Sequence, residues 1–87
     1  MKITYDQKKQ QRNIAERDLS FDLVAQIDWQ SALIKEDNRF DYGETRYIAH
    51  GLINNRLYVA VFTQTPEGIR IISFRKANKR EVKNYEQ

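Results

Sequence analysis

The strongest constraint on the fold of this chain is a series of three strand-like segments in its C-terminal half. Each is rich in β-branched and aromatic residues, and short polar turns separate them. The segments are residues 47–52, 57–63 and 69–75. Asn54-Asn55 forms the first turn because asparagine tolerates left-handed backbone angles, and residues 66–68 form the second. Consecutive hairpins predict an antiparallel sheet, in which residues 57–63, apolar on both faces, form a central strand.

The N-terminal segment predicts a short strand followed by a helix. Residues 2–5 alternate in character, as a short strand does. The Asp6 carboxylate is placed to cap the good helix formers of residues 7–17. This helix is almost entirely polar, so we expect it to lie on the surface with Ile14 and Ala15 as its anchors.

The remaining segments complete an α+β order. Ser20 is placed to cap a second, shorter helix, and residues 32–36 form a plausible strand. Asn78, with Glu81 three residues later, resembles a capping box that opens a C-terminal helix through Tyr85. The predicted order is β-α-α-β-β-β-β-α: a small antiparallel sheet with its two N-terminal helices and C-terminal helix gathered on one side.

Size and composition limit the function classes. The 87 residues allow one domain, residues 1–87, which buries only about 60% of its unfolded surface. The absence of cysteine excludes disulfide scaffolds, thiolate metal sites and cysteine nucleophiles, and one histidine excludes a multi-histidine metal site. The longest uncharged run, residues 57–66, is too short to span a bilayer, and no apolar signal region opens the chain. We therefore expect a cytoplasmic protein.

Charge is distributed unevenly along the chain. Residues 1–17 carry a net charge of +3, residues 18–44 carry −5 and residues 69–87 carry +4. If the two basic ends meet in the fold, they form one positive face that attracts a polyphosphate. The alternative is two solvated helices with ordinary surface charge.

The last strand places cations where it meets the C-terminal helix. Strict alternation puts Arg70, Ile72 and Phe74 on one face and Arg75 on the other. Arginine grips a phosphate with two bonds, so the strand end is a candidate phosphate clamp. Its cations are Arg75, Lys76, Lys79 and Arg80.

Other charged side chains leave alternatives open. Arg75 has a structural alternative, an ion pair with Glu44 or Glu81. Lys8 and Arg12 share one face of the first helix, where they either extend the basic surface or are simply solvated.

Three further features carry weaker signals. Tyr85 stacks on a base, acts as an acid or packs its helix onto the sheet. His50 is a lone strand histidine, which is more often a surface or satisfied residue than a catalyst. The acidic residues beside the expected turn lack a defined ligand spacing, so no metal site is predicted. They are Glu36, Asp37 and Asp41.

Short motifs over nearly the whole chain resemble a known family. They include Tyr5-Asp6, Lys8, Asn13, Ser20-Phe21, Glu44 with Arg46, Tyr47 to Leu52, Arg56, Val59, Val61, Thr63, Arg70 to Ala77, Glu81 and Tyr85. The run Arg-Ile-Ile-Ser-Phe-Arg-Lys-Ala, followed by Glu and Tyr, is the most specific. In these residues the chain resembles the BrnT family.

The resemblance implies a RelE-like fold and a ribonuclease toxin of a type II toxin–antitoxin module. It also implies metal-independent RNA cleavage without a cofactor, and a partner similar to BrnA, a ribbon-helix-helix antitoxin. Operator DNA is then contacted only through the toxin–antitoxin complex. Two non-catalytic alternatives stand beside this reading: a nucleic-acid-binding module, and a partner that completes a repressor complex.

The implied reaction is attack of a 2′-hydroxyl on the adjacent phosphate, which needs a base, cations and an acid. We assign Arg75 and Arg70 to the phosphate. Glu44 or Glu81 is the base or orients the arginines, and Tyr85 is the acid or a stacking platform. The candidate RNA-binding residues are Lys8, Arg12, Lys76, Lys79 and Arg80.

Overall fold

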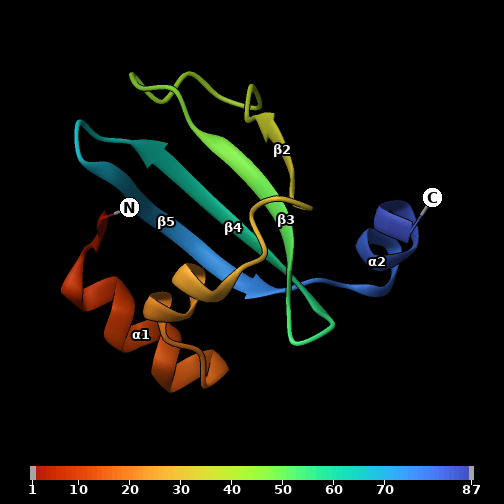
Figure 1. Ribbon diagram of the computed structural model, residues 1–87. Helices are drawn as coiled ribbons and strands as arrows, with labels where there is room; N and C mark the ends of the chain where they lie inside the picture. The colour runs from red at the N-terminus through yellow and green to blue at the C-terminus, as the bar shows by residue number, and fades with distance from the viewer. Residues whose placement is uncertain (1, 87) are drawn as a thin grey trace.

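A computed structural model describes residues 2–86 and contains the predicted elements in the predicted order (Figure 1). They are β1 (Lys2–Tyr5), α1 (Gln7–Arg17), η1 (Phe21–Gln26), β2 (Leu33–Glu36), β3 (Tyr47–Ile53), β4 (Arg56–Gln64), β5 (Gly68–Lys76) and α2 (Lys79–Glu86). The α+β class is therefore confirmed. The second predicted helix, η1, is a 3-10 helix, and the Ser20 side chain caps it as expected.

The strands within residues 2–86 form one sheet in the order β1-β5-β4-β3-β2. Strand β4 lies in the middle, as its apolar residues on both faces predicted. A two-residue turn joins β3 to β4, with φ angles of 48° at Asn54 and 66° at Asn55. This turn fixes the pairing of the two strands, so that His50 lies opposite Val59.

The prediction of a purely antiparallel sheet is wrong, because β1 pairs with β5 in parallel. The sheet is mixed, and Lys2 lies opposite Gly68 in this register. A Cβ atom at Gly68 would overlap the backbone of Lys2, so the close approach requires glycine there. Because β1 and β5 lie far apart in the sequence, no local pattern reveals this pairing.

The hydrophobic core lies between α1, η1 and one face of the sheet, which we call the first face. Its most fully buried large side chains are Phe21, Phe74, Ile71 and Val24. In Figure 1, the orange segment containing η1 crosses in front of the sheet on this face. A glycine at position 51 is needed beneath η1, because a Cβ atom there would meet Ile27.

Helix α1 docks through polar side chains. The expected anchor Ile14 is 44% exposed and Ala15 is exposed, so that prediction is wrong. Instead, buried Asn13 donates from Nδ2 to the carbonyls of Leu19 (2.8 Å) and Phe74 (3.1 Å). Buried Gln10 likewise accepts from a backbone N–H of η1. These bonds satisfy buried polar groups and fix the helix against the sheet.

A β-bulge changes the predicted faces of β5. The pairing with β4 shifts between Val61 and Phe62, which leaves an extra residue, Ile72, in β5. Phe74 therefore lies on the first face, while Arg70 and Arg75 share the opposite, second face. Strict alternation had separated the two arginines, and that assignment is wrong because the bulge reverses the alternation between them.

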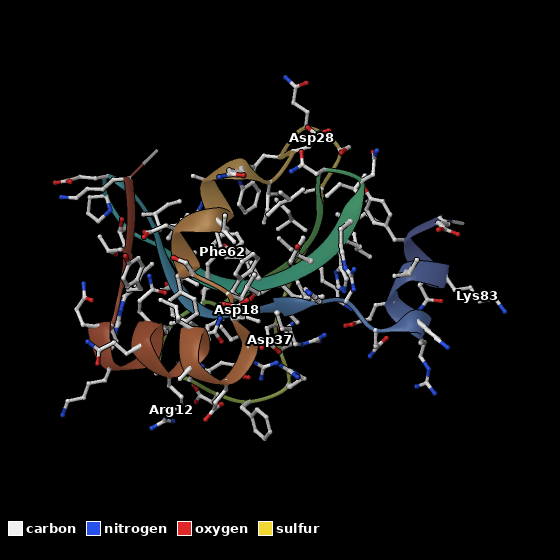
Figure 2. All side chains as sticks on the ribbon, turned by 90° about the horizontal axis from the view of Figure 1, so that it is seen from below. Arg12, Asp18, Asp28, Asp37, Phe62 and Lys83 are labelled. Carbon is white, nitrogen blue, oxygen red and sulfur yellow. The ribbon has the colours of Figure 1, made fainter. Side chains whose placement is uncertain are left out.

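The helices do not all gather on one side. Helix α1 lies at one end of the sheet and α2 at the other (Figure 1), and the labelled Arg12 and Lys83 lie at opposite ends of the molecule in Figure 2. The pairing of β1 with β5 brings the two basic segments of the sequence together along the backbone, but the cations of α1 and of α2 lie apart and do not form one continuous face. The fold thus keeps these two groups of like charges apart, and like charges repel at close range.

Candidate functional site

A groove of about 640 Å³ lies over the second face of the sheet. Its floor is formed by residues in cross-strand register, because His50 pairs with Val59 and Val59 pairs with Arg75. Helix α2 and the loop after β2 form its sides. The lining residues, which define the groove, are Leu33, Ile34, Lys35, Arg39, Ile48, His50, Val59, Val61, Ser73, Arg75, Glu81, Asn84 and Tyr85.

Arg75 and Glu81 form the most strongly bonded pair in the groove. The guanidinium donates two parallel hydrogen bonds to the carboxylate, Nη1 to Oε1 at 2.7 Å and Nη2 to Oε2 at 2.8 Å. Glu81 Oε1 also accepts from the backbone N–H of Asn78 at 2.9 Å, and the Asn78 side chain accepts from the N–H of Glu81 at 2.8 Å. The predicted capping box is thus confirmed, and it holds Glu81 in place to orient Arg75.

These bonds change the proton affinity of both groups. The hydrogen bonds from Arg75 lower the pKa of Glu81 from 4.5 to about 2, against the effect of burial. The same contact raises the pKa of Arg75. Glu81 is therefore a carboxylate at neutral pH, with its charge committed to Arg75. This arrangement fits an orienting role better than the alternative role as a base, since an efficient base has a pKa near the working pH.

The structure brings His50 into the groove, which sequence reasoning missed. Its Nε2 lies 3.7 Å from Glu81 Oε2, and its side chain is 20% exposed. The signal was present in the sequence, because a two-residue turn at Asn54-Asn55 sets the register of β3 against β4. That register assigns His50 to the same face as Val59. Because the bulge in β5 was not predicted, the sequence did not show that Arg75 lies on this face as well.

Arg39 also faces the groove, and it was not predicted. Its guanidinium binds the buried carboxylate of Asp37 through two hydrogen bonds of 2.8 and 2.9 Å. The backbone N–H of Arg39 and the Tyr42 hydroxyl also donate to Asp37, and Arg46 stacks over the Tyr42 ring at 4.0 Å. The pKa of Asp37 is lowered mainly by Arg39, so this acidic residue organises a loop. Among residues 2–86, no group of acidic or histidine side chains is arranged to hold a metal.

The family model described as "Ribonuclease toxin, BrnT, of type II toxin-antitoxin system" matches residues 5–81 of this chain. The chain belongs to the BrnT family. No curated protein matches the chain in a sequence search. The BrnT match includes His50, Arg75 and Glu81 but ends before Tyr85. The chain is thus a ribonuclease toxin of a type II toxin–antitoxin system at the level of its family, and such a system includes an antitoxin partner.

Three other candidate BrnT site residues lie in different environments. Tyr85 lines the groove, and its hydroxyl donates to the carbonyl of Ser31 at 2.9 Å, which ties α2 to the segment before β2. Arg70 is exposed on the second face, five residues along β5 from Arg75, or roughly 15 Å away. Glu44 lies in the loop before β3 and accepts from Arg46 Nε at 3.2 Å. Of these three, the structure brings Tyr85 together with Arg75.

The candidate RNA-binding residues of this BrnT chain are divided among three places. Lys79 and Arg80 are exposed in the first turn of α2, beside the groove. Lys76 is exposed but pairs with Tyr58 on the first face, so it points away from the groove. The other two, Lys8 and Arg12, are exposed on α1, and the labelled Arg12 lies well apart from Lys83 of α2 (Figure 2).

The groove combines cations with an apolar floor. Arg75 and Arg39 lie close enough for the charge of one to oppose that of the other. Val59 is almost fully buried beneath them. Two arginines over an apolar surface form a site for an anion with a flat or apolar neighbour, which describes a nucleotide better than a free inorganic ion.

No helix within residues 2–86 has the length and apolar character needed to cross a membrane.

Proposed function

We propose that this BrnT-family chain is a metal-independent endoribonuclease of the cytoplasm that cuts RNA and thereby inhibits translation. The observation that carries the proposal is the Arg75 guanidinium, held by Glu81 at the edge of a groove that Arg39 also lines. Glu81 and the Lys76 carbonyl leave the Nε–H and the second N–H of Nη2 of Arg75, and this planar pair of donors fits two oxygens of a phosphodiester. Negative charge develops on those oxygens during cleavage, so the same cation stabilises the transition state.

In this proposal the remaining site residues act around Arg75. Glu81 orients the arginine, and Tyr85, one turn further along α2, is the candidate acid or stacking platform. Arg70 contacts a neighbouring phosphate on the same face of the sheet. Glu44, bonded to Arg46 outside the groove lining, is a weaker candidate for the base than the sequence suggested.

The proposed RNA path runs from the groove toward α2, where the exposed Lys79 and Arg80 add sequence-independent attraction to phosphates. Lys8 and Arg12 on α1 contact a more distant part of a long substrate. Lys76 contributes from the side of β5 opposite the groove. Because these cations are exposed, their contribution is expected to fall as salt rises.

The proposed partner is a ribbon-helix-helix antitoxin similar to BrnA. It neutralises the toxin by covering the groove, and the toxin contacts operator DNA only through the complex. Family membership supports the existence of an antitoxin. Co-expression with the neighbouring gene, scored by growth and RNA integrity, tests whether the antitoxin is of this type.

The cleavage test uses the purified chain without antitoxin, RNA substrates and excess EDTA. We expect Arg75→Ala to reduce cleavage by about 100-fold or more, as the loss of a transition-state donor does. Arg75→Lys keeps the charge but loses the planar fork, so it should recover only part of the rate. Arg17→Ala removes an exposed arginine from the end of α1 and serves as the matched control, with unchanged cleavage.

Two results would contradict the proposal. Cleavage that EDTA abolishes would show a metal-dependent reaction. Intact RNA that nevertheless binds with a steep salt dependence would favour the non-catalytic nucleic-acid-binding alternative. Circular dichroism and melting of each variant establish that a lost activity is not a lost fold.

A further inference from the structure

The groove lacks an obvious proton acceptor among its carboxylates. Glu81 is its acidic lining residue, and the two hydrogen bonds from Arg75 hold the pKa of Glu81 at about 2. A base with so low a pKa accepts a proton from a hydroxyl poorly at neutral pH. Tyr85, which donates its hydroxyl proton to the carbonyl of Ser31, is not arranged as an acceptor.

His50 is placed where such an acceptor is needed. It lies in one cross-strand row with Arg75, separated by Val59 of β4, so their Cα atoms are roughly 10 Å apart. Both side chains converge on Glu81, since Nε2 of His50 lies 3.7 Å from the Oε2 that Arg75 also binds. That distance is too long for a strong hydrogen bond, which leaves the imidazole able to exchange a proton with a ligand. Its side chain reaches solvent through the groove, with 20% of its surface exposed.

We propose that His50 is the general base of the cleavage reaction, an inference that rests on the proposed ribonuclease function. The neutral imidazole takes the proton of the 2′-hydroxyl, as that oxygen forms a bond to phosphorus and the bond from phosphorus to the 5′ oxygen breaks. The leaving 5′ oxygen takes a proton from water, because the Tyr85 hydroxyl is bonded to the Ser31 carbonyl and Tyr85 then serves as the stacking platform. The products are a 2′,3′-cyclic phosphate and a 5′-hydroxyl end.

The surroundings of His50 fit this assignment. When the imidazole takes up a proton during the reaction, the Glu81 carboxylate, 3.7 Å away, stabilises the positive charge that forms. The charged and titratable groups that line the groove with His50 are Lys35 of β2, Arg39 of the following loop, Arg75 of β5, and Glu81 and Tyr85 of α2.

The composition makes the test unusually direct, because His50 is the one histidine of the chain. In a tag-free protein, the NMR titration of the imidazole reports His50 alone. We expect cleavage by the wild type to rise with pH along a limb whose midpoint matches that titration. A midpoint of the pH–rate profile that differs from the midpoint of the His50 titration would overturn the proposal.

Substitution provides the second arm. We expect His50→Asn to lower the cleavage rate by about 100-fold or more and to remove the limb. Binding of an oligonucleotide with 2′-O-methyl groups, which cannot be cleaved, should change by less than about twofold, because phosphate contacts dominate affinity. The matched control is Leu52→Asn, which makes the same residue at the next position on the same face of β3, outside the groove lining.

Chemical rescue separates a catalytic from a structural role. Added imidazole should restore part of the cleavage by His50→Ala, and a purely structural role would give no rescue. Wild-type protein that cleaves RNA while His50→Asn keeps the full rate and the same pH profile would overturn the role of His50 but leave the proposed function standing. Wild-type protein that cuts no RNA would instead reject the proposed function itself.

Discussion

At the residue scale, the site depends on how one carboxylate is used. The sequence suggested an ion pair between Arg75 and either Glu44 or Glu81, and the structure decides for Glu81. The capping box could be predicted from the sequence because it depends only on the spacing of three residues between Asn78 and Glu81. The position of His50 beside this pair was not predicted, because it depends on contacts between three strands and a helix.

The charge of Glu81 should contribute to stability over a defined pH range. Because folding lowers its pKa from 4.5 to about 2, the contribution is complete above pH 4.5 and is lost as the pH falls toward 2. We expect Glu81→Gln to destabilise the fold at pH 7 by on the order of 1–2 kcal/mol, after a discount for the partial exposure of Arg75. Urea unfolding at pH 7 and at pH 3 should show the difference from wild type shrinking at the lower pH.

Glu67 offers the control for that experiment. It pairs with Lys2 at 3.1 Å, but both side chains are well exposed. Glu67→Gln should therefore have a much smaller effect, because exposed ion pairs contribute little. An equal loss in both variants, or a Glu81 effect that grows as the pH falls, would contradict the role given to the Arg75–Glu81 pair.

At the scale of elements, local patterns predicted the strands, helices and caps but not all of their pairings. The turn at Asn54-Asn55 determined one register, since both residues adopt positive φ. The bulge at Ile72 was not predicted, although the adjacent apolar residues Ile71 and Ile72 already broke the alternation. The parallel pairing of β1 with β5 joins distant segments, and no spacing rule connects them.

The β1–β5 pairing gives a prediction at this scale. Gly68→Ala places a Cβ atom against the Lys2 backbone, so we expect a loss of about 1–3 kcal/mol of stability. Hydrogen exchange should show faster exchange of the β1 amides, while the β3–β4 hairpin keeps its protection. Glu67→Ala, in the adjoining turn, is the control. Unchanged β1 protection in Gly68→Ala would mean that the close approach does not hold this edge.

At the scale of the whole molecule, the fold separates the cations of α1 from those of α2, although β1 and β5 pair between them. Helices α1 and α2 lie at opposite ends of the sheet in both views (Figures 1 and 2). The charges along the sequence predicted one positive face only if the two basic ends met, and the cations of α1 and α2 lie too far apart in the fold to form it. The cations at α2 adjoin the groove, whereas those at α1 belong to a helix that packs on the first face, and the groove lies over the second face.

This separation predicts independent contributions to RNA binding. We expect the losses of binding free energy from Lys8→Gln/Arg12→Gln and from Lys79→Gln/Arg80→Gln to add within about 0.5 kcal/mol when combined. Each pair should reduce the salt dependence of binding to an uncleavable single strand by up to about 1.4, or about 0.7 for each phosphate contact. A combined loss far from the sum would indicate that both ends act on one short stretch of RNA.

The sequence by itself determined the elements, their order, their caps, the central position of β4 and the family, because these depend on local spacing and on motifs that are contiguous in the chain. The tertiary structure decided the mixed sheet, the face of Arg70, the polar docking of α1 and the grouping of His50 with Arg75 and Glu81. Each of these depends on contacts between segments distant in the sequence. Such contacts are set by packing and by the satisfaction of buried polar groups, which only the folded chain brings together.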